Sequence, residues 1–336
     1  MKKITLLLAT LLATACGQKL DPAAVKSAMP RSEALHIGAP NPSDSAPPQL
    51  AALARTVTGA NLALAPASTA AKAPFAVTSY AFAMAVNTGV FWALAPIAWL
   101  TEVVPPTACT DTACTWGPGA GAGELNRWQL VVTRAGDGYD YVLSGQPVAS
   151  PAAPFVPVIS GRAYPGAIAH RGHGSFGVDF DQAWSGLAHA TGETQHDFGS
   201  IAVDYDARGE AIVNATFRDA INNDHPGDPS APNKVSAAYA FQASATGGDL
   251  QLGFHTQPPY LAGYKDEQVT LRTQWNGLGE GRADVNYTTP GFSAGFNQCW
   301  DGAPDYAMTF DGDPGAPFGT IDACKFAAAP ITITVP

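Results

Sequence analysis

Charged side chains are scarce in this sequence. Lys, Arg, Asp and Glu make up 14% of the 336 residues, and 28 acidic residues outnumber 18 basic ones, which gives a formal net charge of −10. Binding to nucleic acid or to anionic lipid surfaces relies on clustered basic residues. We therefore expect neither nucleic acid nor an anionic lipid surface to be recognised through charge. With 34 Gly and 28 Pro and little charge for helix surfaces, the composition favours strands and loops.

The sequence also lacks the common catalytic motifs. It has no nucleophile elbow, no phosphate-binding loop and no helical His-Glu-x-x-His zinc motif. Gly172-x-Gly174-x-x-Gly177 matches the dinucleotide fingerprint by its letters, but it runs into an expected strand rather than opening a helix. The sequence therefore favours a non-enzymatic protein without a cofactor.

Residues 1–15 have the layout of a secretory signal peptide. A positive start at Lys2 and Lys3 precedes a short apolar run, and Ala13-Thr14-Ala15 supplies small residues before Cys16. This ending resembles the lipobox of type II bacterial signal peptides, which implies that Cys16 becomes the diacylated first residue of a lipoprotein. In enterobacterial lipoproteins, Gly17 in place of Asp implies sorting to the outer membrane.

The resemblance predicts a cell-envelope protein that is held on a membrane by its N-terminal lipid. Each buried methylene contributes about 0.8 kcal/mol, so several acyl chains on one residue hold a protein firmly. Residues 16–74 are rich in Pro, Ala and Ser and have poor hydrophobic periodicity. They are expected to form a lipidated tether, with one helical turn around residues 23–29.

Four cysteines remain after Cys16 is assigned to the lipid, an even number for an oxidising compartment. Sequence alone permits three disulfide pairings. We favour Cys109–Cys114 and Cys299–Cys324, because each pair brackets a turn-rich segment. A metal site is the alternative, although the spacing contains no Cys-x-x-Cys element.

Residues 73–101 contain no charged side chain. The segment is long enough to cross a membrane, but Asn87, Gly89 and Pro96 interrupt it. A helix that is apolar on every side can instead lie in a large core. We predict a buried helix over about residues 78–100, with membrane insertion and strands as the alternatives.

From about residue 127 onward, apolar and polar side chains alternate with the period of β-strands. Turns such as 206–209, 246–249 and 276–279 join these runs, and strands joined so tightly must be antiparallel neighbours. The sequence predicts a mainly β domain over 75–336: an antiparallel meander of about eleven strands that forms a curved sheet or barrel-like fold packed on one long apolar helix. A transmembrane β-barrel is the alternative, although the chain lacks a terminal aromatic signal.

Aromatic residues recur on the strand faces that are expected to be buried. In a curved sheet with a cavity they would bind an apolar or amphipathic small molecule, in outline similar to periplasmic lipid carriers. The predicted ligand-binding residues are Tyr139, Tyr141, Tyr205, Tyr239, Phe241 and Trp275. The alternative function is a structural or surface-interaction lipoprotein with a filled core, whose partner is an envelope protein.

Three further sites remain open from the sequence. His170-x-x-His173 offers two common metal ligands, which makes a metal-assisted hydrolase the third function considered. The loop at 219–233 has oxygen ligands for calcium but lacks EF-hand spacing. A paired-carboxylate active site could use two of the acids that recur on the polar strand faces, although solvent-facing acids explain them equally well. These acids are Asp140, Asp179, Asp181, Asp204 and Asp206.

Overall fold

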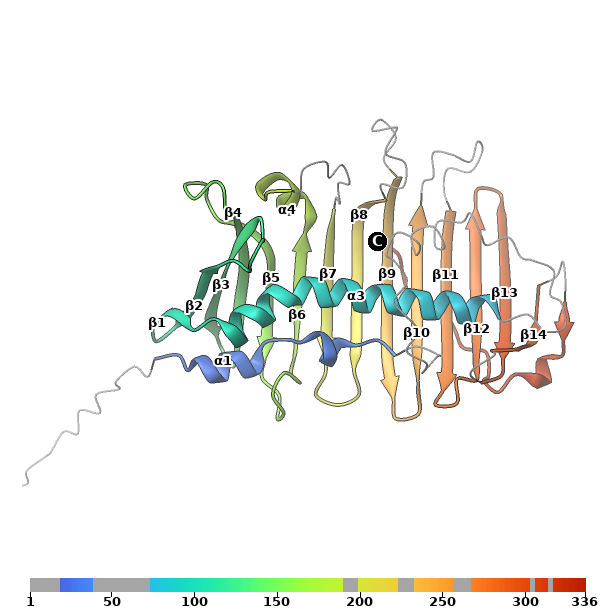
Figure 1. The fold of residues 1–336 in the computed structure, drawn as a ribbon. Helices are drawn as coiled ribbons and strands as arrows, with labels where there is room; N and C mark the ends of the chain where they lie inside the picture. Colours follow the sequence, from blue (N-terminus) through green and yellow to red (C-terminus); the bar gives the residue numbers. More distant parts are fainter. Residues whose placement is uncertain are drawn as a thin grey trace, which may run out of the picture.

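The strands form one open sheet. The computed structural model describes residues 19–38, 73–189, 199–222, 233–256, 267–302, 306–313 and 317–336. Within these residues, fifteen strands pair in sequence order, each with the next one along the chain (Figure 1). In the described part of the chain the two end strands do not pair with each other. The prediction of an antiparallel meander is confirmed, and the sheet stays open rather than closing into a barrel.

All the strand pairs are antiparallel. The strands are β1 (Pro106–Cys109), β2 (Ala113–Gly119), β3 (Asn126–Ala135), β4 (Gly138–Pro147), β5 (Val156–Tyr164), β6 (His173–Asp179), β7 (Ser200–Asp206), β8 (Ile212–Asn222), β9 (Asn233–Ser244), β10 (Gly247–Thr256), β11 (Glu267–Asn276), β12 (Gly281–Thr289), β13 (Phe292–Trp300), β14 (Met308–Asp311) and β15 (Phe318–Gly319). We call the face that carries the long helix the inner face, and the opposite one the outer face.

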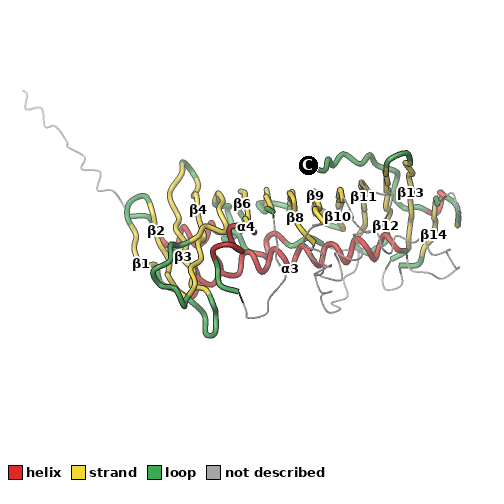
Figure 2. Tube along the Cα trace, turned by 90° about the horizontal axis from the view of Figure 1, so that it is seen from above, coloured by secondary structure: helices red, strands yellow, loops and turns green. Residues whose placement is uncertain are grey.

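The long helix, α3 (Pro74–Val103), lies across the strands on the inner face (Figures 1 and 2). Proline suits the first turn of a helix, where its missing N–H is not needed. The buried side chains recur every three or four residues and so form one stripe along the helix: Ala76, Ser79, Ala83, Val86, Val90, Leu94, Ile97 and Leu100. Among the described residues, α3 alone is long and apolar enough to cross a membrane by length and composition, and here it packs on the sheet.

Polar contacts fix α3 in position on an otherwise apolar face. The hydroxyls of Ser79 and Thr273 are 2.6 Å apart, and both residues are fully buried. Near the start of the helix, the N–H of Phe75 donates to the Gln298 side-chain oxygen at 3.2 Å. These pairs satisfy polar groups that would otherwise be buried without partners, which is costly. The register of α3 on β11 and β13 is therefore well defined.

Residues 19–38 belong to the core rather than to a tether. They form α1 (Pro22–Ala28) and the 3-10 helix η1 (Ser32–Leu35), and Leu20, Val25 and Ile37 are almost completely buried. The helical turn expected near residues 23–29 is confirmed by α1. The predicted signal peptide, Cys16 and the rest of the tether, 39–72, lie outside the described residues.

Both predicted disulfides are confirmed. Cys109 bonds to Cys114 across the β1–β2 hairpin, and Cys299 on β13 bonds to Cys324. Cys324 follows the short 3-10 helix η2 (Ile321–Ala323). The second bond therefore fastens the start of the last chain segment to the sheet.

Candidate functional site

The aromatic side chains predicted to bind a ligand are covered by the protein itself. Tyr141, Tyr205, Tyr239, Phe241 and Trp275 lie on the inner face and are at most 6% exposed, and Tyr139 is half-buried beside them. The ring of Phe82 on α3 contacts Tyr239 edge-on at 5.7 Å, while Phe241 stacks on Trp275. Gly38, at the end of the N-terminal part, lies against Phe241 and Trp275. An apolar ligand at these residues would have to displace the segments that cover them, so binding there stays a prediction.

Two tyrosine hydroxyls on this face have no hydrogen-bond partner among the described residues. They belong to Tyr141 and Tyr205, which reach over Gly161 and Gly174 on the neighbouring strands. Burial raises the pKa of both phenols above the ordinary value. These tyrosines therefore stay neutral over the physiological range of pH.

The two candidate metal ligands have separate neighbours. The Nδ1 atom of His170 is 3.1 Å from the carbonyl oxygen of Met29, and the ring of His173 stacks on Tyr164. In the described part of the chain, no three His, Cys, Asp or Glu side chains come together as a metal site would require. Most of the loop considered for calcium, residues 223–232, lies outside the described residues.

Most of the recurring acids have structural partners. Asp140 pairs with Arg162 and Asp206 with Arg208, while Asp179 caps the short helix α4 (Phe180–Gly186). Asp181 accepts a hydrogen bond from the N–H of Gly199. The hydrogen bonds from Arg162 lower the pKa of Asp140, and those from Arg208 lower the pKa of Asp206 to about 2. Carboxylates held ionised in this way do not serve as general acids near neutral pH.

The outer face carries two continuous rows of side chains, which follow from the strand register. One row, the polar row, is rich in Asp, Arg and amide side chains: Thr133, Asp140, Arg162, Ser175, Asp204, Asn214, Ala240, Gln251, Arg272, Asp284 and Asn297. The other row, the small row, lies two residues away from the polar row on each strand. It is dominated by small side chains: Val131, Val142, Ser160, Gly177, Ala202, Thr216, Ala238, Gly253, Thr270, Asn286 and Gly295.

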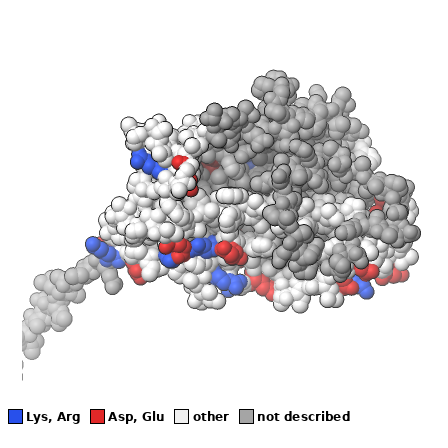
Figure 3. All heavy atoms as spheres, in the orientation of Figure 1, with Lys and Arg blue, Asp and Glu red and all other residues white. Residues whose placement is uncertain are grey.

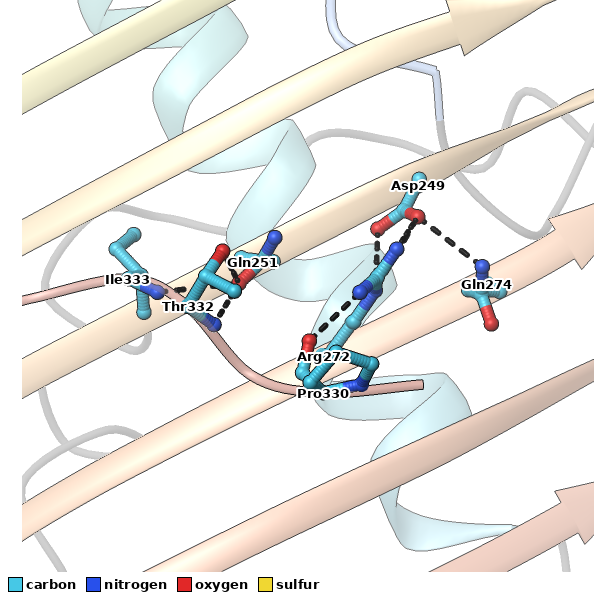
Figure 4. Close-up of polar contacts among 7 residues, drawn as sticks. All are labelled: Asp249, Gln251, Arg272, Gln274, Pro330, Thr332 and Ile333. Carbon is cyan, nitrogen blue, oxygen red and sulfur yellow. Dashed lines mark hydrogen bonds and ion pairs between the residues drawn. The ribbon is translucent and has the colours of Figure 1, made fainter. Parts of the chain in front are cut away.

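Residues 325–336, which we call the C-terminal segment, cross the strands on the outer face (Figure 2). The Arg272 Nη1 atom donates to the carbonyl oxygen of Pro330 at 2.6 Å (Figure 4). The Gln251 side-chain oxygen accepts from the N–H groups of Thr332 and Ile333 at 2.7 and 3.2 Å. The polar row therefore holds the backbone of an extended segment that is not itself part of the sheet.

The small row makes room for the apolar side chains of the C-terminal segment. A Cβ atom added at Gly253 would lie 2.7 Å from a methyl group of Val335 and 3.4 Å from one of Ile333. The alternation in Ile331-Thr332-Ile333-Thr334-Val335 turns every second residue toward the sheet, since these three apolar residues are half-buried and the threonines are exposed. The small side chains of the small row thus leave space for the β-branched side chains of the C-terminal segment.

Over β4 to β8 the same two rows are open. The polar row lines two shallow hollows of about 390 and 420 Å³, which share Arg162, Ser175 and Asp204. The small row borders only the smaller hollow, at Ser160, Gly177 and Ala202. The Arg162 side chain is 48% exposed, whereas Arg272 beneath the C-terminal segment is 18% exposed. Each of these arginines is held in place by an aspartate, Asp140 and Asp249 respectively. The open part of the outer face therefore has the same kind of Asp–Arg pair as the part that the C-terminal segment covers.

The sequence did not reveal this face as a site. Its acids were recognised, but Gln251, Arg272 and the small row have no motif, because strand register alone brings them together. Two signals were available: the disulfide at Cys324, which fastens the start of the segment to β13, and the alternation over 331–335, which is typical of an extended segment.

Replacing Gln251 with methionine tests what holds the C-terminal segment. Methionine keeps the side-chain length but loses the oxygen, and a neutral hydrogen bond is worth about 1 kcal/mol. We expect the amides of Thr332 and Ile333 to exchange hydrogen several times faster in the variant. Gln242→Met, on the exposed part of β9, is the matched control and should leave both rates unchanged. Unchanged exchange in Gln251→Met would mean that other contacts hold the segment.

Comparison of the chain with protein-family models, with curated proteins and with solved structures found no match.

Proposed function

We propose that this chain is an envelope lipoprotein, carried on a membrane by a lipid on Cys16, that binds an extended segment of a partner polypeptide on its outer sheet face. The apolar run and small residues before Cys16 support the anchor. The two disulfides support an oxidising compartment outside the cytoplasm. The proposal assigns the protein no enzymatic step.

The packing of the inner face favours surface binding over a carrier function. A carrier needs an empty apolar cavity for its ligand, whereas α3 fills the inner face from β13 to β2 and places Leu94, Ile97 and Leu100 in the core. Residues 19–38 fill the space beside it. The outer face, by contrast, offers a surface that a partner could reach without any rearrangement of the fold.

The main support for the proposal is the way in which the outer face binds the C-terminal segment. This segment provides an example, within one chain, of the ligand that the two rows accept: an extended backbone with alternating β-branched side chains. Its path across β12, β11 and β10 continues toward β8 and the open hollows. A partner segment of the same chemistry could extend that path without moving any strand.

Site-specific photocrosslinking in cells tests the proposal. A photoreactive residue at Ala202, in the open small row, is expected to give a discrete adduct with a partner protein. The substitution Gly177→Gln should abolish that adduct, because its side chain would fill the hollow. The fold should tolerate it, since the nearest atom to an added Cβ is 3.5 Å away.

The matched control lies at the far end of the same row. Gly295→Gln also meets no atom closer than 3.6 Å, and it should leave the adduct from Ala202 intact. A photoreactive residue at Thr288, on β12, should give no such adduct. If Ala202 gives no adduct, or if Gly177→Gln and Gly295→Gln leave it equally strong, the outer face is not the binding surface.

A further inference from the structure

The exposed side of α3 is apolar, which is unusual for a helix on a protein surface. Phe91 and Trp92 are 49% and 67% exposed, and Val77 and Val103 are also exposed. Within 73–101 no charged residue interrupts this side. A surface helix ordinarily turns polar residues outward. In Figure 3, which views this face, the charged atoms of the described residues gather mainly along one lower margin.

The attachment point of the N-terminus identifies what lies next to this side. Leu20 is fully buried, and its N–H donates to the carbonyl oxygen of Thr110, in the β1–β2 turn, at 2.8 Å. Only three residues separate it from Cys16. Four extended residues reach about 14 Å at most. A lipid on Cys16 would therefore hold the β1–β2 end of the molecule close to the bilayer.

The same end of the molecule carries the end of α3. Val103 lies three residues before β1, and Glu102 forms ion pairs with Lys26 and Arg31 of the N-terminal part. The helix and residues 19–38 run along the same face (Figure 1). The lipid and the apolar side of α3 are thus presented by one face of the protein.

Several features of α3 suit the membrane interface rather than the hydrocarbon core. Pro96 has no N–H to donate to the carbonyl of Trp92, and that carbonyl needs water or another donor. The Asn87 side chain forms two hydrogen bonds with the backbone of Ile37, which hold α3 against residues 19–38. Exposed Trp and Phe side chains are typical of helices that lie in the interface.

We infer that the apolar side of α3, with Phe91 and Trp92 at its centre, rests on the lipid bilayer to which Cys16 anchors the protein. The inference rests on the lipid anchor in the proposed function. It orients the molecule: the inner side faces the membrane, and the outer sheet face points away from it. The polar row is then free to meet a partner that does not touch the bilayer.

Fluorescence quenching by brominated lipids tests this orientation. The full-length lipidated protein is reconstituted in vesicles of phosphatidylethanolamine with a minority of phosphatidylglycerol. An environment-sensitive label is placed at Phe91→Cys, and in a matched variant at Ser160→Cys, which is exposed on the outer face. We expect bromolipids to quench the label at position 91 several-fold more strongly than the label at 160.

The possible outcomes distinguish a wrong orientation of the protein on the bilayer from the absence of the lipid anchor. If the protein floats with the vesicles but both labels are quenched equally, or only the one at 160, the bilayer does not contact α3 and the inference is wrong. If the wild-type protein does not float, the anchor itself fails, and the reason for placing α3 on lipid fails with it. Adding Trp92→Glu to the Phe91→Cys variant should weaken the quenching, because a carboxylate avoids the acyl region.

Discussion

Replacing the anchoring cysteine is expected to release the protein from the membrane almost completely. The Cys16→Ser variant is placed after a standard secretory signal peptide, so that export continues while lipid attachment cannot occur. Diacylation contributes far more binding free energy than the exposed side of α3, since about 0.8 kcal/mol accrues with every buried methylene. The wild-type protein should partition into the detergent phase and incorporate labelled palmitate, whereas the Cys16→Ser variant should stay in the aqueous phase without label.

Ala15→Gly, which keeps Cys16 and a small residue before it, is the matched control and should behave like the wild type. A wild-type protein that takes up no palmitate would show that Cys16 carries no acyl chain. Weak, reversible binding of the Cys16→Ser variant to vesicles would remain compatible with the anchor, because α3 retains its apolar side. Full retention of the Cys16→Ser variant in the detergent phase would contradict it.

The class of fold could be predicted because the alternation of apolar and polar residues is typical of a β-strand with one buried face. A sheet with one buried face needs apolar residues at every second position, and short turns permit only antiparallel neighbours. The described part of the chain has fifteen strands where the sequence predicts about eleven, and among the additional ones β2 and β5 break this pattern. In β5, Pro157 and Gly161 interrupt the alternation, and β2 contains Gly117-Pro118-Gly119. Such residues carry no strand signal, although the neighbouring strands supply enough hydrogen bonds to include them.

Closure of the sheet could not be predicted from strand number. Barrel closure depends on pairing between the first and last strands, and here these are short: β1 has four residues and begins at Pro106, and β15 has two. Short, proline-bearing edge strands offer little to pair with. The helix α3 covers the apolar inner face instead, so the sheet does not need to close into a barrel to bury that face.

The site was harder to predict than the fold for a physical reason. Arg162, Asp204 and Asn214 are separated along the chain, and they form one row only because the register of three strand pairs aligns them. A register shift of one residue would turn these side chains to the other face. The sequence predicts a tether over residues 19–38, because buried side chains such as Leu20 and Val25 are spaced too irregularly to give a helical or strand period.

Leu94→Ala is expected to destabilise the protein by about 2–5 kcal/mol, the cost of a cavity in a well-packed core. Leu94 is 1% exposed and lies in the stripe of α3 that faces the sheet. Trp92→Ala on the same helix is the matched control. Its side chain is 67% exposed, so the loss should stay within about 0.5 kcal/mol although many more atoms are removed. Urea unfolding in the Cys16→Ser background measures both differences without interference from lipid.

These two substitutions distinguish the possible roles of α3. If Leu94→Ala is as mild as Trp92→Ala, the helix separates from the sheet without unfolding it. The part of the aromatic inner face that α3 covers, such as Tyr239, would then be accessible, and the prediction of a bound apolar ligand would be favoured over surface binding. If Trp92→Ala is as costly as Leu94→Ala, the indole packs against protein rather than lipid, which would contradict the proposed orientation. A large effect at 94 and a small one at 92 require a helix with one side in the core and the other available to the membrane.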